Sequence, residues 1–396
     1  MITPAVFAAI RNALPPLAPG VNIPVVVGIV GGLLIAAAFL AFIAAHWLEL
    51  ARLLRLAMLL AGIAVAHGLG AWFARTGRPV LADLCASIAA IVFGAGIALV
   101  GQMYHLGGDF AGGMLLWALG ALASAALTGS RGALAVALVA ASIWSSMRGI
   151  EARDVPHFSF LAIWLLAAGL ALAWNSRVAA HLVAVATLPW WLTSALQADL
   201  EPSFVLANGA AVLFGGGLAL AAAPWPRATL AGSVLSAYGA ISLAGVAVLE
   251  VTTVNDFFSA GAAGPPPWAI ACGIAGVILA CTAAATTRRA GAAFAGAAIG
   301  LVLLSAAVWP PRQGSEPWLA YAFELCAMLC LVVSGMLDGA RARIVAGWLG
   351  IAGVIAGITW AVKGSLLRRS AFLAVAGAAA VALATVLNRL LPRTNQ

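Results

Sequence analysis

Long apolar stretches recur along the chain from Val25 to Leu387, and only short polar breaks separate them. Most stretches are about 20 residues long, which is the length that an α-helix needs to cross a hydrocarbon layer of roughly 30 Å. The pattern therefore predicts an all-α fold, a polytopic transmembrane helix bundle of about 14 spans built of consecutive helical hairpins. The approximate span cores are 25–46, 53–73, 82–101, 112–129, 132–147, 158–174, 178–196, 203–223, 229–249, 267–286, 290–308, 318–336, 343–361 and 371–387.

The composition leaves no room for a soluble domain. Hydrophobic residues make up 64% of the chain and charged residues 8%, whereas a soluble protein of this size needs far more polar surface. The net charge is +8, but the basic residues are scattered over helix ends, as membrane orientation requires, and do not form a nucleic-acid-binding patch. The lipid bilayer is therefore the expected partner, and nucleic acid is not.

The spans divide the chain into three predicted parts. Residues 1–24 form an N-terminal interfacial segment, which includes a short amphipathic helix over residues 3–14. Residues 25–147 form an N-terminal transmembrane module, and residues 148–396 form C-terminal transmembrane hairpins. The first apolar core is too long for the apolar region of a secretory signal and is interpreted as a span.

The distribution of basic residues predicts the orientation. With the N-terminus on side one, twelve basic residues fall on that side and eight on the other, and the richer side is the cytoplasmic one. The strong use of Arg, Ala and Gly is typical of a GC-rich bacterium, so we expect a multi-pass protein of the bacterial inner membrane with both termini cytoplasmic. The twelve are Arg11, Arg75, Arg78, Arg131, Arg177, Arg227, Arg288, Arg289, Arg341, Arg343, Arg389 and Arg393. The eight are Arg52, Arg55, Arg148, Arg153, Arg312, Lys363, Arg368 and Arg369.

Five cysteines lie inside the apolar segments. None forms a CxxC pair, and no histidine lies near them at the spacing of metal ligands. They are interpreted as small packing residues, so we expect no disulfide, no bound metal and no cofactor.

Small residues recur at helix-packing spacing in the C-terminal half. Gly296 and Gly300 form one GxxxG motif, and Gly353 and Gly357 form another. Close approach of helix backbones is a main source of helix association in lipid. The motifs predict packing inside the bundle, and a homo-oligomer formed through these small-residue faces is the alternative.

Two arginine turns show a similar spacing. Ser130-Arg131 is followed thirteen residues after the arginine by Trp144, and Ser176-Arg177 is followed at the same distance by Trp190. Internal duplication, which many transporters show, is one interpretation. The alternative is that any arginine-turn hairpin of this length has the same spacing.

The most polar connection between spans is GQMYHLGGDF at residues 101–110. Gly107 and Gly108 interrupt the helix there, so the polar side chains are predicted to converge on one turn at the outer membrane boundary. A carboxylate beside His105 would orient the imidazole ring, which suits acid–base chemistry or the binding of a polar headgroup. The alternative is a loop lid whose polar groups only satisfy one another. The candidate side chains are Gln102, Tyr104, His105 and Asp109.

Further polar residues lie at the end of the first span and inside later spans. His46 and Trp47 stand at the outer end of the first span, where Trp47 is an interface anchor and His46 is a candidate neighbour of His105. His67 and Glu324 lie within apolar spans, and such residues usually face a bundle interior or water. For His67 the favoured interpretation is a structural hydrogen bond to a neighbouring helix, and a functional role is the alternative. For Glu324, near the outer boundary, the favoured interpretation is a carboxylate that snorkels to the surface.

The residues named for the first three spans also carry a resemblance. The run Ala44-Ala45-His46-Trp47, the turn at residues 75–79, and the Gln-x-Tyr-His element at residues 102–105 with the downstream Trp117 resemble an uncharacterised bacterial membrane family, domain of unknown function 2157. The resemblance covers about residues 25–145. Members commonly have Asn where this chain has His46. The resemblance implies a multi-span inner-membrane protein and implies no reaction.

Three hypotheses for function follow. The first is a transporter or flippase of a small or lipid-linked polar substrate, supported by the number of spans, the hairpin spacing and the outer polar cluster. The second is a structural or accessory protein in envelope assembly. The third is a membrane-embedded enzyme that uses His105 and Asp109, and it is the least favoured because no second catalytic constellation accompanies them. No regular series of intramembrane acids is present, which argues against a proton pump.

Overall fold

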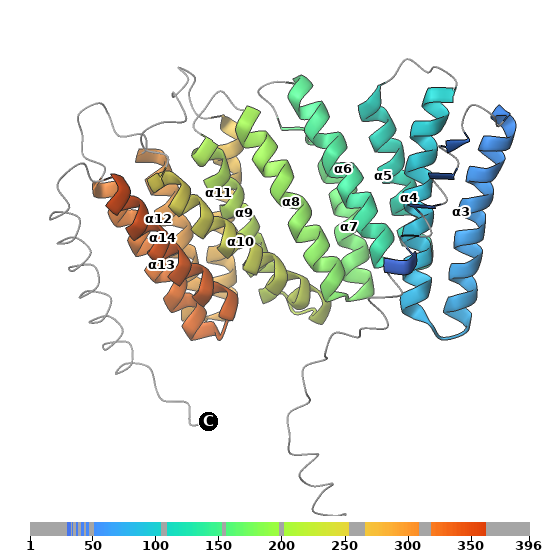
Figure 1. The fold of residues 1–396 in the computed structure, drawn as a ribbon. Coiled ribbons are helices and arrows are strands. Elements are labelled where there is room, and N and C mark those ends of the chain that lie inside the picture. The colour runs from blue at the N-terminus through green and yellow to red at the C-terminus, as the bar shows by residue number, and fades with distance from the viewer. Residues whose placement is uncertain are drawn as a thin grey trace, which may run out of the picture. The chain divides into compact units, whose positions relative to one another are not determined.

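The computed structural model describes residues 51–103, 109–152, 156–197, 202–252, 266–308 and 318–361, and scattered positions between 30 and 46. The continuous ranges form twelve helices, nearly all of the scattered positions are helical as well, and none of these residues is in a strand (Figure 1). They are α3 (Arg52–Arg75), α4 (Pro79–Met103), α5 (Phe110–Thr128), α6 (Arg131–Ala152), α7 (Phe160–Trp174), α8 (Arg177–Gln197), α9 (Pro202–Ala222), α10 (Pro226–Thr252), α11 (Pro267–Thr287), α12 (Ala290–Val308), α13 (Trp318–Asp338) and α14 (Arg341–Ala361).

The prediction of an all-α membrane fold is confirmed. Eleven of the described helices are long and apolar enough to cross a membrane, and α7 is a shorter apolar helix. Each predicted span core between residues 53 and 361 coincides with one of these helices. The predicted interfacial segment 1–24 and the last span 371–387 lie outside the described residues, and so does much of the first span 25–46.

Tight turns join the helices into hairpins. Five turns contain a residue in the left-handed backbone region, at Gly77, Gly129, Asn175, Arg288 and Gly339. A helix commonly ends on such a residue because the backbone N–H there can bond a carbonyl of the last turn. At Gly129, for example, the N–H bonds the carbonyl of Ala125. Each of these turns carries one or more of the arginines assigned to side one, so the sequence pattern of arginine turns corresponds to real hairpin ends.

Two of these turns share a serine cap and a tryptophan anchor. The hydroxyl of Ser130 accepts a bond from the N–H of Ala133 (3.0 Å), and Ser176 makes the equivalent contact three residues ahead (3.4 Å). Before each turn, a tryptophan donates its indole N–H to a carbonyl of a neighbouring helix, Trp117 to Ala90 (2.8 Å) and Trp164 to Val183 (3.0 Å). The local similarity therefore includes hydrogen bonds as well as spacing.

The described helices belong to two compact units that divide at residues 137 and 138. The first unit contains α3, α4, α5 and the start of α6. The second contains the rest of α6 and all later helices, and its apolar core is formed by α9 to α14. In the second unit α9 packs against α10 and α11, and α14 packs against α10 and α13.

Glycines allow the helices of the second unit to approach closely. A Cβ at Gly239 of α10 would collide with the backbone of Phe214 in α9, and one at Gly217 would collide with the backbone of Ser236. Gly353 and Gly357 of α14 face Val248 and Val251 of α10, so this GxxxG motif packs inside the bundle as predicted.

The other predicted GxxxG motif contributes less to this packing. Gly296 has only an ordinary van der Waals contact with Ala280, and no neighbour lies within 4 Å of a Cβ at Gly300. Gly300 therefore permits no close helix contact among the described residues.

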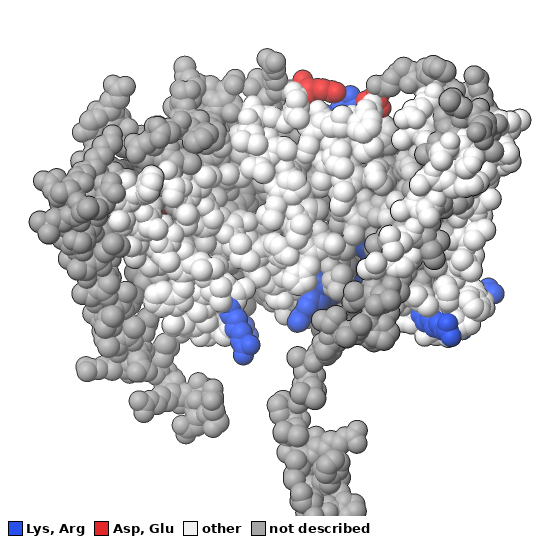
Figure 2. All heavy atoms as spheres, in the orientation of Figure 1, with Lys and Arg blue, Asp and Glu red and all other residues white. Residues whose placement is uncertain are grey.

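The long sides of the helices are apolar and exposed. Large hydrophobic side chains such as Leu127, Leu349 and Trp360 are more than 60% exposed, which in water would be a strong liability and in lipid is the expected surface. Figure 2 shows the visible charged side chains at helix ends, with an uncharged zone along the helices. The chain is therefore a polytopic membrane protein.

A histidine that the sequence analysis did not single out lies in the connection before α7. The ring of His157 packs edge-on against Trp144 with centroids 4.4 Å apart, and its Nδ1 lies 3.3 Å from the hydroxyl of Ser145. Its carbonyl accepts a bond from the indole N–H of Trp190 (3.1 Å). Burial, and to a smaller extent the charge of Arg148, lowers the pKa of His157 below its ordinary value.

We expect substitution of Gly239 by Val to destabilise the second unit by about 1–3 kcal/mol or more, because the new side chain would collide with the α9 backbone. Gly245→Val is the matched control, since it lies in the same helix and has no neighbour within 4 Å. Thermal unfolding of the purified protein in detergent measures both. An equal loss of stability in the two variants would show that helix propensity, and not packing, is responsible.

We expect acidification to weaken the corner around His157. Its lowered pKa favours the neutral ring in the folded protein, so stability is retained above the unfolded value of about 6.5 and is lost as the pH falls through that value towards the folded one. The thermal midpoint should fall between about pH 7.5 and about pH 5, and less so in His157→Gln. An identical pH dependence in parent and variant would rule out His157 as the source.

Candidate functional site

The structure places two of the four predicted loop residues at one groove. Gln102 is in the last turn of α4, and Asp109 directly precedes α5. Both line a groove of about 900 Å³ in the first unit, whose remaining lining is mostly apolar and comes from α3, α4 and α5. Tyr104 and His105 lie outside the described residues, so the proposed convergence of all four stays a prediction.

The histidine of the first span has a local partner. His46 is half-buried in a turn, and its Nδ1 lies 3.0 Å from the carbonyl oxygen of Phe42, one turn earlier. Trp47 lies outside the described residues, as does His105, the predicted neighbour of His46.

His67 lines a second groove of the first unit, with a volume of about 730 Å³, together with Asp83 and Arg131. The Asp83 carboxylate accepts a 2.6 Å bond from the Ser130 hydroxyl and a 3.2 Å bond from the N–H of Gly132. A carboxylate at a helix N-terminus satisfies free N–H groups and complements the helix dipole. Asp83 is therefore a cap that joins α4 to the start of α6, and His67 stands beside this cap.

Glu324 is the predicted intramembrane residue with the most unusual surroundings. It lies six residues after the start of α13, and it is 0% exposed. The expectation that Glu324 snorkels to the outer surface is wrong. At this register of α13 its side chain points towards α10 and α12 and not along the helix towards water, so the carboxyl group is enclosed by the bundle.

Glu250 of α10 and Ser305 of α12 are the polar side chains that interact with the Glu324 carboxyl group. Glu250 is 1% exposed, and its Oε2 accepts a 2.9 Å hydrogen bond from the Ser305 hydroxyl. No described residue gives either oxygen of Glu324 a hydrogen bond of standard geometry. We name Glu250, Ser305 and Glu324 the carboxyl cluster.

The carboxyl cluster lies near one end of its helices. Glu250 is two residues from the end of α10, Ser305 is three residues from the end of α12, and Glu324 is six residues into α13. At 1.5 Å per residue these positions are all within about 10 Å of a helix terminus. Asn208, which is buried in the first two turns of α9, belongs to the same end.

Proton binding is the chemistry that this arrangement supports. Two carboxylates that face one another inside a low-dielectric bundle repel one another, and neither can donate a hydrogen bond to the other, because an ionised carboxylate only accepts hydrogen bonds. One proton on the pair removes one charge and supplies an O–H donor that the oxygens of Glu324 otherwise lack. The cluster therefore favours a state in which the two acids share at least one proton.

The described residues contain no group of three or more His, Cys, Asp and Glu side chains that would hold a metal ion. The carboxyl cluster offers two carboxylates and one hydroxyl, which is fewer oxygen ligands than the about six to eight that Ca²⁺ takes. All five cysteines lie in the described helices as free thiols.

Glu250 is a candidate functional residue that the sequence pattern did not indicate. The predicted span ended at residue 249, so Glu250 was assigned to the polar connection after it. In the structure α10 continues to Thr252 and buries this residue. The available signal was the apolar run VAVL at residues 246–249 together with Val251, which follows the acid.

Comparison with known protein families gives a match for the first part of the chain. No curated protein and no solved structure matches the chain. The sequence resemblance is confirmed, because residues 1–134 match the family described as predicted membrane protein, DUF2157.

Proposed function

We propose that this protein is a transporter of a small or lipid-linked polar substrate, and that the carboxyl cluster binds and releases a proton during its cycle. The single observation that carries the proposal is Glu324, a fully buried acid that faces a second acid and has no hydrogen bond of standard geometry from the described residues. Ionisable groups inside a membrane bundle are costly and commonly belong to ion or proton pathways.

The closed environment of the cluster supplies a coupling mechanism. A shared proton stabilises the packed arrangement of α10, α12 and α13, because it removes repulsion between the acids. Loss of the proton leaves two buried negative charges, which favours any arrangement that admits water to them. Proton occupancy therefore biases the equilibrium between a closed and an open bundle, which is what proton-coupled transport requires.

The proposed setting is the bacterial inner membrane, with both termini in the cytoplasm. The arginine turns support this orientation, since short connections rich in Arg stay on the cytoplasmic side. The carboxyl cluster, at the opposite helix ends of the second unit, would then lie towards the outer face. A proton taken up from outside would reach it through less than half the thickness of the bundle.

An accessory role in envelope assembly is the second candidate. The tight glycine packing of α9, α10 and α14 favours it, because a scaffold needs a rigid bundle more than a moving one. An enzyme based on His105 and Asp109 has less support, because the sequence offers no second catalytic constellation beside that pair.

We expect Glu324→Gln to retain solute binding and exchange but to lose the coupling of solute movement to the proton gradient. The amide is a neutral isostere that can donate to Glu250, so the variant should fold with a thermal midpoint equal to or above that of the parent. Purified protein in liposomes, given an imposed pH gradient and a panel of labelled polar solutes and lipid-linked headgroups, should accumulate a solute in the parent. In the variant the same solute should exchange without accumulating.

Glu151→Gln is the matched control, because Glu151 is an exposed acid that pairs with Arg148 at 2.8 Å. It should accumulate solute like the parent. If the pH gradient changes no solute movement in the parent, or if Glu324→Gln accumulates solute equally well, the coupling proposal is wrong. If no solute moves or stabilises the protein at all, the accessory role is favoured.

The predicted outer loop remains part of the proposal as a substrate-contacting element. We expect His105→Ala and Asp109→Asn to keep thermal midpoints close to that of the parent and to lose transport of the solute found above. A purely structural loop would show the opposite, with lowered midpoints in both variants. A stable, fully active double variant would show that the loop is only a connection.

A further inference from the structure

The opposite helix ends of the second unit carry a second polar cluster, built around a buried arginine. Arg343, in the first turn of α14, is 7% exposed. Its Nη1 donates to the carboxylate of Asp338 (2.7 Å) and to the hydroxyl of Ser334 (3.1 Å), both on α13. The guanidinium carbon lies 5.6 Å from the centroid of the Phe214 ring of α9. We name Arg289, Ser334, Asp338 and Arg343 the arginine cluster.

One edge of the Arg343 guanidinium has no acceptor among the described residues. All of its hydrogen bonds to them leave from Nη1, and Nε is buried without a partner. The Nε–Nη2 edge is one of the two that bind carboxylate or phosphate oxygens in a bidentate manner. A buried donor without a partner is unfavourable, so a ligand that supplies oxygens there removes that cost.

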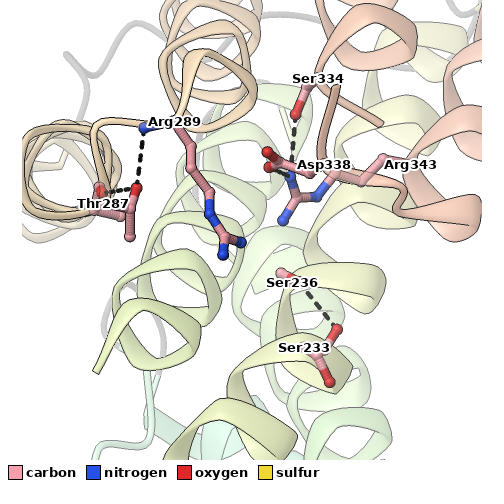
Figure 3. Close-up of polar contacts among 8 residues, drawn as sticks. Ser233, Ser236, Thr287, Arg289, Ser334, Asp338 and Arg343 are labelled. Atoms are coloured by element: carbon pink, nitrogen blue, oxygen red, sulfur yellow. Dashed lines mark hydrogen bonds and ion pairs between the residues drawn. The ribbon is translucent and has the colours of Figure 1, made fainter. Parts of the chain in front are cut away.

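A second arginine points towards the same space. Figure 3 shows the side chain of Arg289 extending towards the Arg343 guanidinium, with Ser236 of α10 beneath them. Arg289 directly precedes α12, and its backbone N–H is held at 3.4 Å from the Thr287 hydroxyl. Arg289 is exposed and forms no ion pair with the described part of the chain.

The charges of the cluster are not balanced. Asp338 neutralises one of the two arginines, and its carboxylate can lie against the start of α12 because Gly291 has no side chain there. The remaining positive charge and the adjacent N-terminus of α12 both attract an anion. An oxyanion between the two guanidinium groups would relieve their repulsion and meet the Nε–Nη2 edge.

We propose that the arginine cluster is a binding site for a phosphate group, carried either by a lipid headgroup or by a soluble molecule. Phosphate has several oxygens that match the planar fork of a guanidinium, and one arginine would bind each side of it. The site lies at the helix ends where Arg227 and Arg341 also stand, which is the level of headgroups in a bilayer. The proposal does not depend on the transport function, because the carboxyl cluster lies at the other end of the helices.

Arg289→Gln is the decisive variant, because Arg289 is exposed and its loss should not impair folding. Arg341→Gln is the matched control. Arg341 is also exposed and begins the same helix as Arg343, but two residues apart on a helix project to opposite faces. The double variant Asp338→Asn with Arg343→Gln removes both charges of the buried ion pair together, so no buried charge loses its partner.

The measurement is the thermal midpoint of the purified full chain. In one arm, inorganic phosphate is titrated into the protein in neutral detergent. In the other arm, the protein in phosphatidylglycerol nanodiscs is compared with the protein in phosphatidylcholine nanodiscs. We expect the parent to be stabilised in at least one arm. The concentration of phosphate or mole fraction of phosphatidylglycerol needed should rise roughly tenfold in Arg289→Gln and in the double variant, because a charge-assisted contact is lost, and should stay unchanged in Arg341→Gln.

The two arms identify the source of the phosphate. Stabilisation by inorganic phosphate indicates a soluble ligand, and stabilisation only by phosphatidylglycerol indicates a lipid headgroup. An Arg289→Gln variant that responds like the parent would overturn the proposal. Equal losses in Arg289→Gln and Arg341→Gln would also overturn it, since the effect would then come from the general positive charge of this helix end. A parent that is stabilised in neither arm has no such site.

Discussion

Every polar group that enters a hydrocarbon layer must find a partner inside the protein, and the structure follows from that constraint. The backbone meets it by forming helices, which is why long apolar stretches of this chain are helical in the described residues. Side chains meet it by local bonds. Trp117 and Trp164 donate to carbonyls of neighbouring helices, and Asp83 accepts from the start of α6. Where the constraint is met only in part, a functional group is the natural interpretation.

The second unit holds two places where a buried polar group has only some of the hydrogen-bond partners that it needs. At one end Glu324 is enclosed with Glu250, and a proton would supply the donor that its oxygens need. At the other end one edge of Arg343 has no acceptor from the described residues, and an anion would supply one. The two clusters differ in sign and in the ligand that would complete them. Glycine contacts hold α14 close to α10 and to α13, so each cluster includes residues of this closely packed part of the bundle.

The glycine packing and the polar clusters make opposite demands on the bundle, because the first makes it rigid and the second requires access to its interior. Close backbone contact holds α9, α10 and α14 in a rigid core. Helices in lipid depend on such contact for association, because apolar side chains gain no hydrophobic energy from leaving lipid. The transport cycle that we propose nevertheless requires the bundle to open. The register of α10 suggests how both demands are met. Its glycines lie along its length, whereas Glu250 stands two residues from its end, where Ser305 of α12 contacts it. Movement at this end would change access to the carboxyl cluster and preserve the central contacts.

The sequence by itself determined the class of the protein, the position of the helices between residues 53 and 361 and the arginine turns. These depend on local length, apolarity and turn chemistry, and lipid leaves the backbone little alternative to a helix. It also marked Glu324 as unusual. Only the tertiary structure decided that Glu324 is enclosed and paired with Glu250, that Arg343 is buried against Asp338 and Phe214, and that one GxxxG motif packs tightly while Gly300 does not. These facts depend on which face each helix turns towards helices that are distant in sequence. When nearly every face is apolar, hydrophobic periodicity cannot identify the one that points inward.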